Sequence, residues 1–221
     1  MKNTIIITAG GIGKRMGTEI PKQFIEINEL PILMHTINQF FDYDNSIQII
    51  VVLPKEHIDY WTGLINKFKY KIKHKIVIGG QERFYSIKNG LQIATGQIIG
   101  IHDGVRPFVS TQVIQQAFKT AKTSLTAIPV IDLKESIVKL ENNSSKSVDR
   151  SKYKIVQTPQ CFQSHIIKKA YLQSYSSHFT DDASVVEKMG EEIHLIQGND
   201  ENIKITTPFD LVLAEAILKS N

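Results

Sequence analysis

Short apolar runs alternate along this chain with longer segments in which apolar residues recur every three or four positions. The runs are typical of buried strands and the periodic segments of amphipathic helices. Strands are predicted at residues 4–8, 47–53, 75–78, 98–102, 125–131, 154–156 and 193–196. Helices are predicted at residues 31–41, 61–68, 83–94, 113–121 and 181–189, and from residues 164 and 208 onward. This alternation predicts a three-layer α/β fold, in which helices cover both faces of a mainly parallel sheet.

The alternation breaks between residues 133 and 152. Polar and apolar residues alternate over 134–140, and an Asn-Ser turn follows at 142–145. This pattern predicts a β-hairpin arm, residues 133–152, that protrudes from a single domain spanning residues 1–221; an irregular surface loop is the alternative. Because an isolated hairpin is only marginally stable in water, we expect the arm to clasp a second subunit in a homodimer.

The composition narrows the class of ligand. The 221 residues carry a net charge of +4, and no dense run of lysine and arginine occurs. We therefore expect an anionic small molecule, and not nucleic acid, as the partner. Cys161 is the single cysteine and no apolar run reaches membrane-spanning length, so we expect a cytoplasmic protein without disulfides or membrane contact.

The stretch from residue 5 to residue 22 carries the strongest chemical signal. A buried strand is followed by closely spaced glycines and then by cations, at Gly10, Gly11, Gly13, Lys14, Arg15 and Lys22. Glycines let a ligand approach the backbone closely, and a turn of exposed amides after a strand forms a concave anion site. Because no carboxylate occurs before Glu19, the stretch predicts a loop that binds a polyphosphate.

Two familiar phosphate-binding loops fit this stretch less well. Thr8 stands where a Walker loop has its first glycine, and Arg15 where it has serine or threonine. Gly10 and Gly13 approximate a dinucleotide fingerprint, but cations crowd the turn and no helix of the right pattern follows. An ordinary glycine turn with solvated lysines is a further alternative.

Two other stretches offer polar groups that could contact a ligand. Residues 79–86 follow a predicted strand and place Arg83 and Ser86 on one helix face, where they could hold a base or a ribose. A plain strand-to-helix turn explains the same spacing. Residues 157–160 place the hydroxyl of Thr158 beside a proline, and could equally form a turn.

Charged groups stand out in two more places. Residues 102–107 follow a predicted strand, so Asp103 lies where α/β sheets bind ligands and suits Mg²⁺. Arg106 can bind a phosphate, unless it forms an internal salt bridge with Asp103. Lys204 lies in a predicted short strand before the last helix and could simply face solvent.

Taken together, these motifs resemble the 2-C-methyl-D-erythritol 4-phosphate cytidylyltransferase family over essentially the whole chain. The resemblance rests on residues 8–17, 21–24, 79–86, 102–107, 148–150, 157–162, 180–184 and 202–206. It implies a Rossmann-like nucleotidyltransferase fold and a reaction in which a polyol phosphate attacks the α-phosphate of CTP and releases pyrophosphate. A phosphate dianion is already a nucleophile at neutral pH, so positioning and charge stabilisation suffice for this reaction.

The resemblance also implies residue roles. Arg15, Lys22 and Lys204 would stabilise the transition state at the α-phosphate. CTP would be bound by Ala9, Gly10, Gly11, Gly13, Lys14, Gly80, Gln81, Arg83 and Ser86. The polyol phosphate would be bound by Asp103, Arg106, Ser136, Arg150 and Thr158, with Asp103 also holding Mg²⁺ and Arg150 reaching the site of the neighbouring subunit.

The chain departs from the family pattern in two places. Thr8 and Gly10 stand where the family more often has proline and alanine, a change that leaves amide binding intact. The family usually has Asp-Thr after Pro-Val, whereas this chain continues with Ile131-Asp132-Leu133. The missing hydroxyl is therefore assigned to Ser136.

Three rival functions differ in what they require. A ribitol 5-phosphate cytidylyltransferase shares the chemistry, but residues 148–150 favour methylerythritol. A short-chain oxidoreductase would resemble a family with Tyr-x-x-x-Lys, and none of the seven tyrosines has lysine four positions on. A non-catalytic nucleotide sensor would not need Arg15 and Lys22 together beside Asp103.

Overall fold

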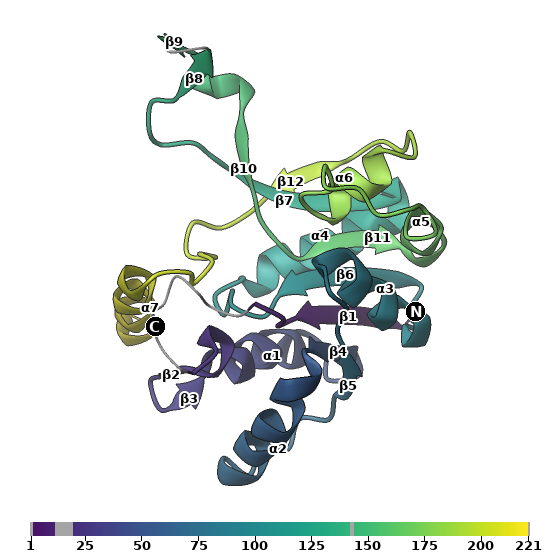
Figure 1. Cartoon of the computed structure of the whole chain (residues 1–221), viewed down its shortest axis with the longest axis vertical. Coiled ribbons are helices and arrows are strands. Elements are labelled where there is room, and N and C mark those ends of the chain that lie inside the picture. Colours follow the sequence, from purple (N-terminus) through teal and green to yellow (C-terminus); the bar gives the residue numbers. More distant parts are fainter. Residues whose placement is uncertain (1, 12–19, 142–143, 221) are drawn as a thin grey trace.

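The computed structural model describes residues 2–11, 20–141 and 144–220, and an eight-stranded sheet forms its centre (Figure 1). In sheet order the strands are β10 (Lys154–Val156), β7 (Thr126–Asp132), β11 (Gln160–Gln163), β6 (Ile98–Asp103), β1 (Asn3–Thr8), β4 (Gln48–Leu53) and β5 (Lys75–Ile78), with β12 (Leu195–Gln197) paired to β7. β10 and β11 run antiparallel to their neighbours, and the other strands of this sheet point in one direction. The predicted mainly parallel sheet is therefore confirmed.

Helices cover both faces of the sheet, as predicted. One face carries α1 (Ile32–Tyr43), α2 (Ile58–Lys67) and α4 (Thr111–Ser124), and the other carries α3 (Arg83–Ile93), α5 (Ser164–Ala170) and α6 (Asp182–Glu187). Strand β1 shows why two cores form, because successive side chains of a strand point to opposite faces. Ile5 and Ile7 belong to the core that also contains Phe40 of α1 and Trp61 of α2. Ile6 joins the other core.

A third, smaller cluster attaches the last helix. Helix α7 (Pro208–Ser220) packs beside the short strands β2 (Glu26–Ile27) and β3 (Leu30–Pro31) (Figure 1). The cluster includes buried Val105 from the loop after β6 and Ile205 from the segment before α7. It therefore brings two segments that bear predicted site residues against each other.

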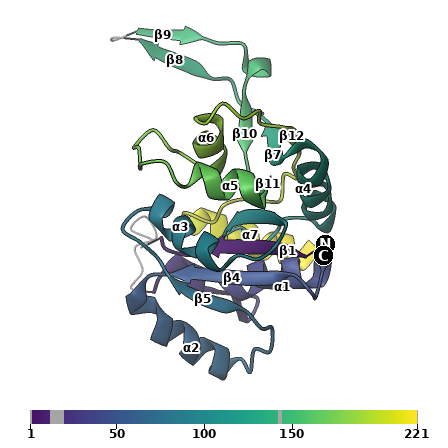
Figure 2. The same ribbon diagram turned by 90° about the vertical axis from the view of Figure 1, so that its right-hand side faces the viewer.

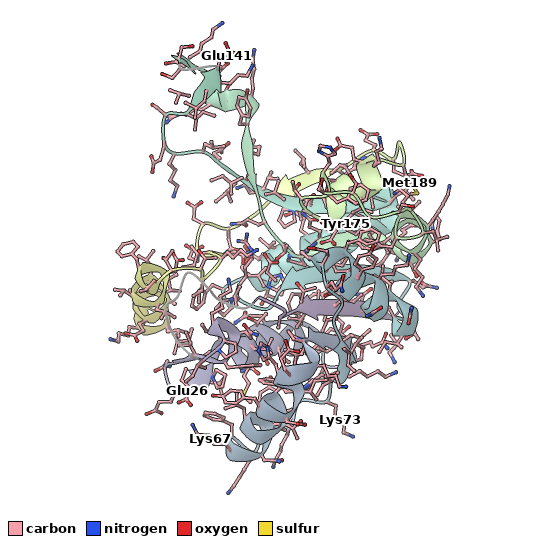
Figure 3. The ribbon with its side chains drawn as sticks, viewed as in Figure 1. Glu26, Lys67, Lys73, Glu141, Tyr175 and Met189 are labelled. Carbon is pink, nitrogen blue, oxygen red and sulfur yellow. The ribbon has the colours of Figure 1, made fainter. Side chains whose placement is uncertain are left out.

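The arm is a separate two-stranded hairpin that projects from the body of the molecule (Figures 1 and 2). Its strands are β8 (Val138–Glu141) and β9 (Ser144–Ser147), and Glu141 lies near its end (Figure 3). Every residue of both strands is exposed, including Val138 and Leu140, which is 81% exposed. The predicted hairpin is confirmed, with strands shorter than the 133–152 segment that contains them.

Two local predictions need correction. β11 was not predicted, because a four-residue strand between a proline turn and a helix has almost no pattern of its own. Lys204 lies in an irregular segment without strand pairing, because this segment packs through Ile205 beside Val105 of the loop after β6 and not against a strand. No helix among the described residues is long and apolar enough to cross a membrane.

The turn between β2 and β3 suggests a stability test. Asn28 and Glu29 have φ values of 45° and 63° and join the paired residues Ile27 and Leu30. A two-residue loop with both φ values positive favours Asn-Gly, because glycine alone adopts this conformation without steric cost. We expect Glu29→Gly to raise the free energy of unfolding by about 0.5–1 kcal/mol in urea denaturation, as relief of strain outweighs the extra entropy of the unfolded chain. Asn28→Gly is the matched control and should gain less stability, since asparagine tolerates positive φ. An unchanged or lower stability of Glu29→Gly would contradict the strain that we assign to Glu29.

Candidate active site

A cavity of about 270 Å³ opens at the carboxyl edge of β6, β1, β4 and β5. These strands are parallel, so the turns that follow them meet at one edge of the sheet. The cavity is lined by Thr8, Ala9, Gly10, Gly11, Lys22, Gln23, Val52, Pro54, Gly79, Gly80, Gln81, Glu82, Arg83, Ser86, Asp103, Val105 and Lys204. Ten of the predicted site residues are therefore brought together here: Ala9, Gly10, Gly11, Lys22, Gly80, Gln81, Arg83, Ser86, Asp103 and Lys204.

The turn after β1 supplies backbone to one side of the cavity. The amide of Ala9 donates to the carbonyl of Val52 at 2.9 Å, which continues the β1–β4 pairing to the start of the turn. Gly10 is exposed, and a Cβ added to it would meet nothing within 4 Å among the described residues, so the turn faces open space at this point. Gly13, Lys14 and Arg15 lie outside the described residues, and their predicted roles stay predictions.

Lys22 reaches the cavity from a short 3-10 helix, Lys22–Phe24, whose other two residues are anchored. Buried Gln23 donates its side-chain amide to the carbonyl of Ala9 at 2.8 Å. Phe24 stacks on Trp61 with ring centroids 5.9 Å apart. These two contacts fix Lys22 beside the glycine turn. Sequence reasoning missed the role of Gln23, whose only signal was its place in a motif.

The turn after β5 depends on Gly80. A Cβ at this position would lie 2.3 Å from the Cβ of Tyr85, so only glycine fits. The Gly80 amide donates to the Ser86 hydroxyl at 3.1 Å, which holds the turn against the first turn of α3. Backbone groups of residues 79–82 are thereby presented to the cavity as a small, shaped surface suited to a base or ribose.

Arg83 is held in place by a residue that the sequence analysis did not assign. Its two terminal nitrogens donate to both carboxylate oxygens of Asp182, at 2.9 and 2.6 Å. Asp182 is fully buried and also accepts from the Tyr171 hydroxyl at 2.6 Å. A bidentate, buried pair of this kind fixes the guanidinium plane, so Arg83 lines the cavity in one orientation.

Asp103 at the end of β6 is a carboxylate of the cavity, whose described lining also includes Glu82. Its Oδ2 lies 3.1 Å from Arg106 Nε and 3.1 Å from Lys204 Nζ. Burial by itself raises the pKa of the Asp103 carboxyl, but nearby cations, led by Lys204 and Arg83, outweigh burial and hold this pKa well below its usual value. Asp103 is thus an anion at any working pH. Among the described residues, both of its ion pairs are made by the same oxygen, Oδ2.

The backbone around Asp103 is fixed by buried His102 and Thr158. His102 Nε2 lies 3.0 Å from the carbonyl of Arg106 and must donate to it. Nδ1 of the neutral ring therefore accepts, and the Thr158 hydroxyl, 2.9 Å away, donates to it. The same hydroxyl accepts from the Asp103 amide at 3.2 Å. Burial lowers the pKa of His102 to about 4, which keeps this arrangement neutral.

Four predicted substrate-binding residues do not line the cavity of their own chain. The Thr158 hydroxyl points inward, as just described, and Arg106 is committed to Asp103 and to the carbonyl of Asn202 at 2.7 Å. The internal salt bridge considered for Arg106 is therefore present. Ser136 and Arg150 lie on the exposed arm, where Arg150 donates to the carbonyl of Lys134.

The metal prediction rests on Asp103 alone. Among the described residues, no group of three histidine, cysteine, aspartate or glutamate side chains could hold a metal ion. Mg²⁺ commonly binds one or two carboxylates and takes its remaining ligands from phosphate oxygens and water. The Asp103 carboxylate, in the same cavity as the glycine turn, fits that donor set.

The sheet, the amide-rich turn and the charged groups at one edge define an α/β nucleotidyltransferase. Residues 3–220 match the model of one family in this class, described as 2-C-methyl-D-erythritol 4-phosphate cytidylyltransferase. The chain belongs to this family. The match covers all the motifs that carried the resemblance.

Individual relatives agree with this assignment. The chain is 51% identical over 219 residues to 2-C-methyl-D-erythritol 4-phosphate cytidylyltransferase of Bacteroides fragilis, with 99% of this chain and 100% of the relative covered. It is 44% identical to the enzyme of that name from Porphyromonas gingivalis, with 99% of each covered. The crystal structure of the Thermus thermophilus enzyme superposes with a TM-score of 0.82 at 28% identity, over 99% of this chain and 100% of that one. The ribitol and oxidoreductase alternatives are not favoured by any of these relatives.

Proposed function

We propose that this protein transfers CMP from CTP to 2-C-methyl-D-erythritol 4-phosphate. A phosphate oxygen of the polyol phosphate attacks the α-phosphorus, the bond from this phosphorus to the bridging oxygen of the β-phosphate breaks, and pyrophosphate leaves. The product is 4-diphosphocytidyl-2-C-methyl-D-erythritol. The observation that carries the proposal is the meeting of Lys22, Asp103 and Lys204 with the glycine turn in one cavity, in a chain that matches the family over residues 3–220.

The residues of the cavity suit a reaction without a general base. The Asp103 carboxylate is ion-paired with Arg106 and Lys204, and both ring nitrogens of neighbouring His102 are hydrogen-bonded inside the protein. The attacking phosphate needs no deprotonation, so the task of the site is to align two anions and stabilise the charge that develops. Lys22 and Lys204 approach from separate segments, and we assign this stabilisation to them, with Arg15 as a further predicted contributor.

Mg²⁺ belongs to this proposal as a bound partner of the triphosphate. Asp103 would hold the ion through the oxygen that does not carry the Arg106 and Lys204 pairs, and phosphate oxygens would complete its shell. The ion would supply neutralisation of the triphosphate charge.

We also propose that the protein is a homodimer joined through the arm. Every residue of the two strands of the arm is exposed, and its base exposes the apolar side chains of Tyr153, Ile155 and Val156. Exposed apolar residues on a projecting hairpin favour pairing with a second copy. Arg150 and Ser136 lie on this segment, so both would meet the substrate in the partner's cavity if the arm reaches it.

The proposed function is tested by pyrophosphate release. We expect CTP with 2-C-methyl-D-erythritol 4-phosphate to release pyrophosphate, and CTP with ribitol 5-phosphate to release at least about 100-fold less, since a site built for one set of hydroxyls leaves polar groups unpaired with another. ATP, GTP and UTP should replace CTP poorly, because residues 79–82 line the cavity and their fixed backbone groups distinguish the donor and acceptor positions of a base. Comparable turnover with ATP, or a preference for ribitol 5-phosphate, would contradict the proposal.

A further inference from the structure

Asn202 lies at the centre of a buried hydrogen-bond network beside the cavity, although it is not part of the cavity lining. Its side-chain Nδ2 donates to the carbonyl of Thr158 at 2.8 Å and reaches Oε1 of Gln157 at 3.4 Å. Its main-chain carbonyl accepts from Arg106 Nη1 at 2.7 Å and from Gln157 Nε2 at 3.4 Å. One fully buried residue therefore contacts two different segments of the chain.

These contacts close a ring around the carboxylate. Arg106 joins Asn202 to Asp103, because Nη1 of Arg106 binds the Asn202 carbonyl while Nε lies 3.1 Å from Asp103 Oδ2. From Asn202 the chain runs two residues to Lys204, whose Nζ lies 3.1 Å from the same oxygen. The position of Lys204 relative to Asp103 is thus set by where Asn202 is fixed.

The segment that carries Lys204 is held on its C-terminal side by residues 205 and 206, since Thr206 donates its amide and its hydroxyl to Asp210 Oδ2 at 2.8 and 3.0 Å. The segment pairs with no strand. The Ile205 amide donates to the carbonyl of Val105, in the loop after β6, at 3.0 Å. Buried Ile205 holds one side of Lys204, and Asn202 is the corresponding anchor on the other side. A lysine side chain is long and flexible, so its ammonium reaches a defined position only if its backbone is held at both sides.

We propose that Asn202 is a positioning residue for the transfer reaction: its buried amide locks the segment that carries Lys204 onto residues 157 and 158, and Thr158 in turn accepts from the Asp103 amide through its hydroxyl. The expected loss of kcat rests on the proposed function, whereas the anchoring of the segment does not. Without the amide, the backbone beside Lys204 loses its bonds to residues 157 and 158, and the Lys204 ammonium is no longer held at the position that stabilises the α-phosphate. Misplacement of about 1 Å at a catalytic group lowers rates by up to about 100-fold.

The test is Asn202→Leu, which keeps the branched shape of the side chain and removes its hydrogen bonds. We expect kcat for pyrophosphate release to fall about 10- to 100-fold, with the KM for CTP changed less than about threefold, since the turns after β1 and β5 are left intact. Amide hydrogen exchange at residues 203–206 should become faster, which reports on the anchor without using activity.

The matched control is Thr126→Val. Thr126 is also fully buried and also ties distant segments, since its hydroxyl donates to the carbonyl of Glu192 at 2.9 Å and accepts from the amide of His194 at 2.9 Å. It lies at the start of β7, away from the cavity lining. Its loss should lower the melting temperature and leave kcat unchanged.

Each outcome decides the proposal. Normal kcat in folded Asn202→Leu, or an equal kcat loss in Thr126→Val, would overturn it. If Asn202→Leu does not fold, Asn202→Ala must show the kcat loss, and failure of both to fold would make the amide a stability element and refute a positioning role. If the wild-type protein released no pyrophosphate from CTP, the proposed function would fail, while exchange at residues 203–206 would still decide whether Asn202 holds the segment.

Discussion

Replacing Lys22 by alanine is expected to lower kcat for pyrophosphate release about 100- to 1,000-fold while the KM for CTP changes only a few-fold. Lys22 lines the cavity beside the glycine turn and is held there by its neighbours Gln23 and Phe24. Negative charge on the oxygens of the α-phosphate grows as the new bond forms. A fixed ammonium therefore contributes more to the transition state than to binding of CTP.

Steady-state kinetics with both substrates varied would measure this effect. Lys73→Ala is the matched control, since Lys73 is an exposed lysine far from the arm and outside the cavity lining (Figure 3). It should retain wild-type kcat and KM. A Lys22→Ala enzyme with normal kcat and weaker CTP binding would show that Lys22 only binds the nucleotide. Arg15→Ala is predicted to behave like Lys22→Ala on sequence grounds, since Arg15 lies outside the described residues.

The second large effect is recovery of activity when two inactive variants exchange subunits. Lys22→Ala should be nearly inactive, and Arg150→Ala likewise if the arm brings Arg150 to the partner's cavity. In a mixed dimer, one site then combines an intact Lys22 with an intact Arg150 of the partner, and the other site lacks both. Random exchange makes half of the dimers mixed, so about a quarter of wild-type activity should return.

The structure explains why this test is informative. Arg150 lies on the exposed arm and is not among the residues that line the cavity of its own chain. If Arg150 acted within its own chain, every site in every dimer would lack one residue and the mixture would stay inactive. Persistent inactivity, with exchange confirmed by mass spectrometry, would therefore reject the shared site. Lys152→Ala, an exposed residue two positions away, is the control for damage to the arm and should be active alone.

The sequence by itself determined the layout of this protein. Alternation of apolar runs with amphipathic segments predicted the layers, because burying a strand on both faces requires helices above and below it. It also predicted where the site lies: the glycine turn, residues 79–82 and Asp103 all follow strands that run parallel in one sheet. The hairpin was recognisable because a period of two replaced the helical period.

Only the tertiary structure decided which polar groups line the cavity and which form hydrogen bonds with one another inside the protein. Arg106 and Thr158 stand in motifs as promising as that of Lys204, yet their side chains bond inward. Arg83 pairs with Asp182, 99 residues away, and Arg106 with Asn202, 96 residues away. The partner of a buried polar group depends on which distant segments the packed core brings together, and no local pattern records that choice, so the anchoring role of Asn202 emerges only from the folded chain.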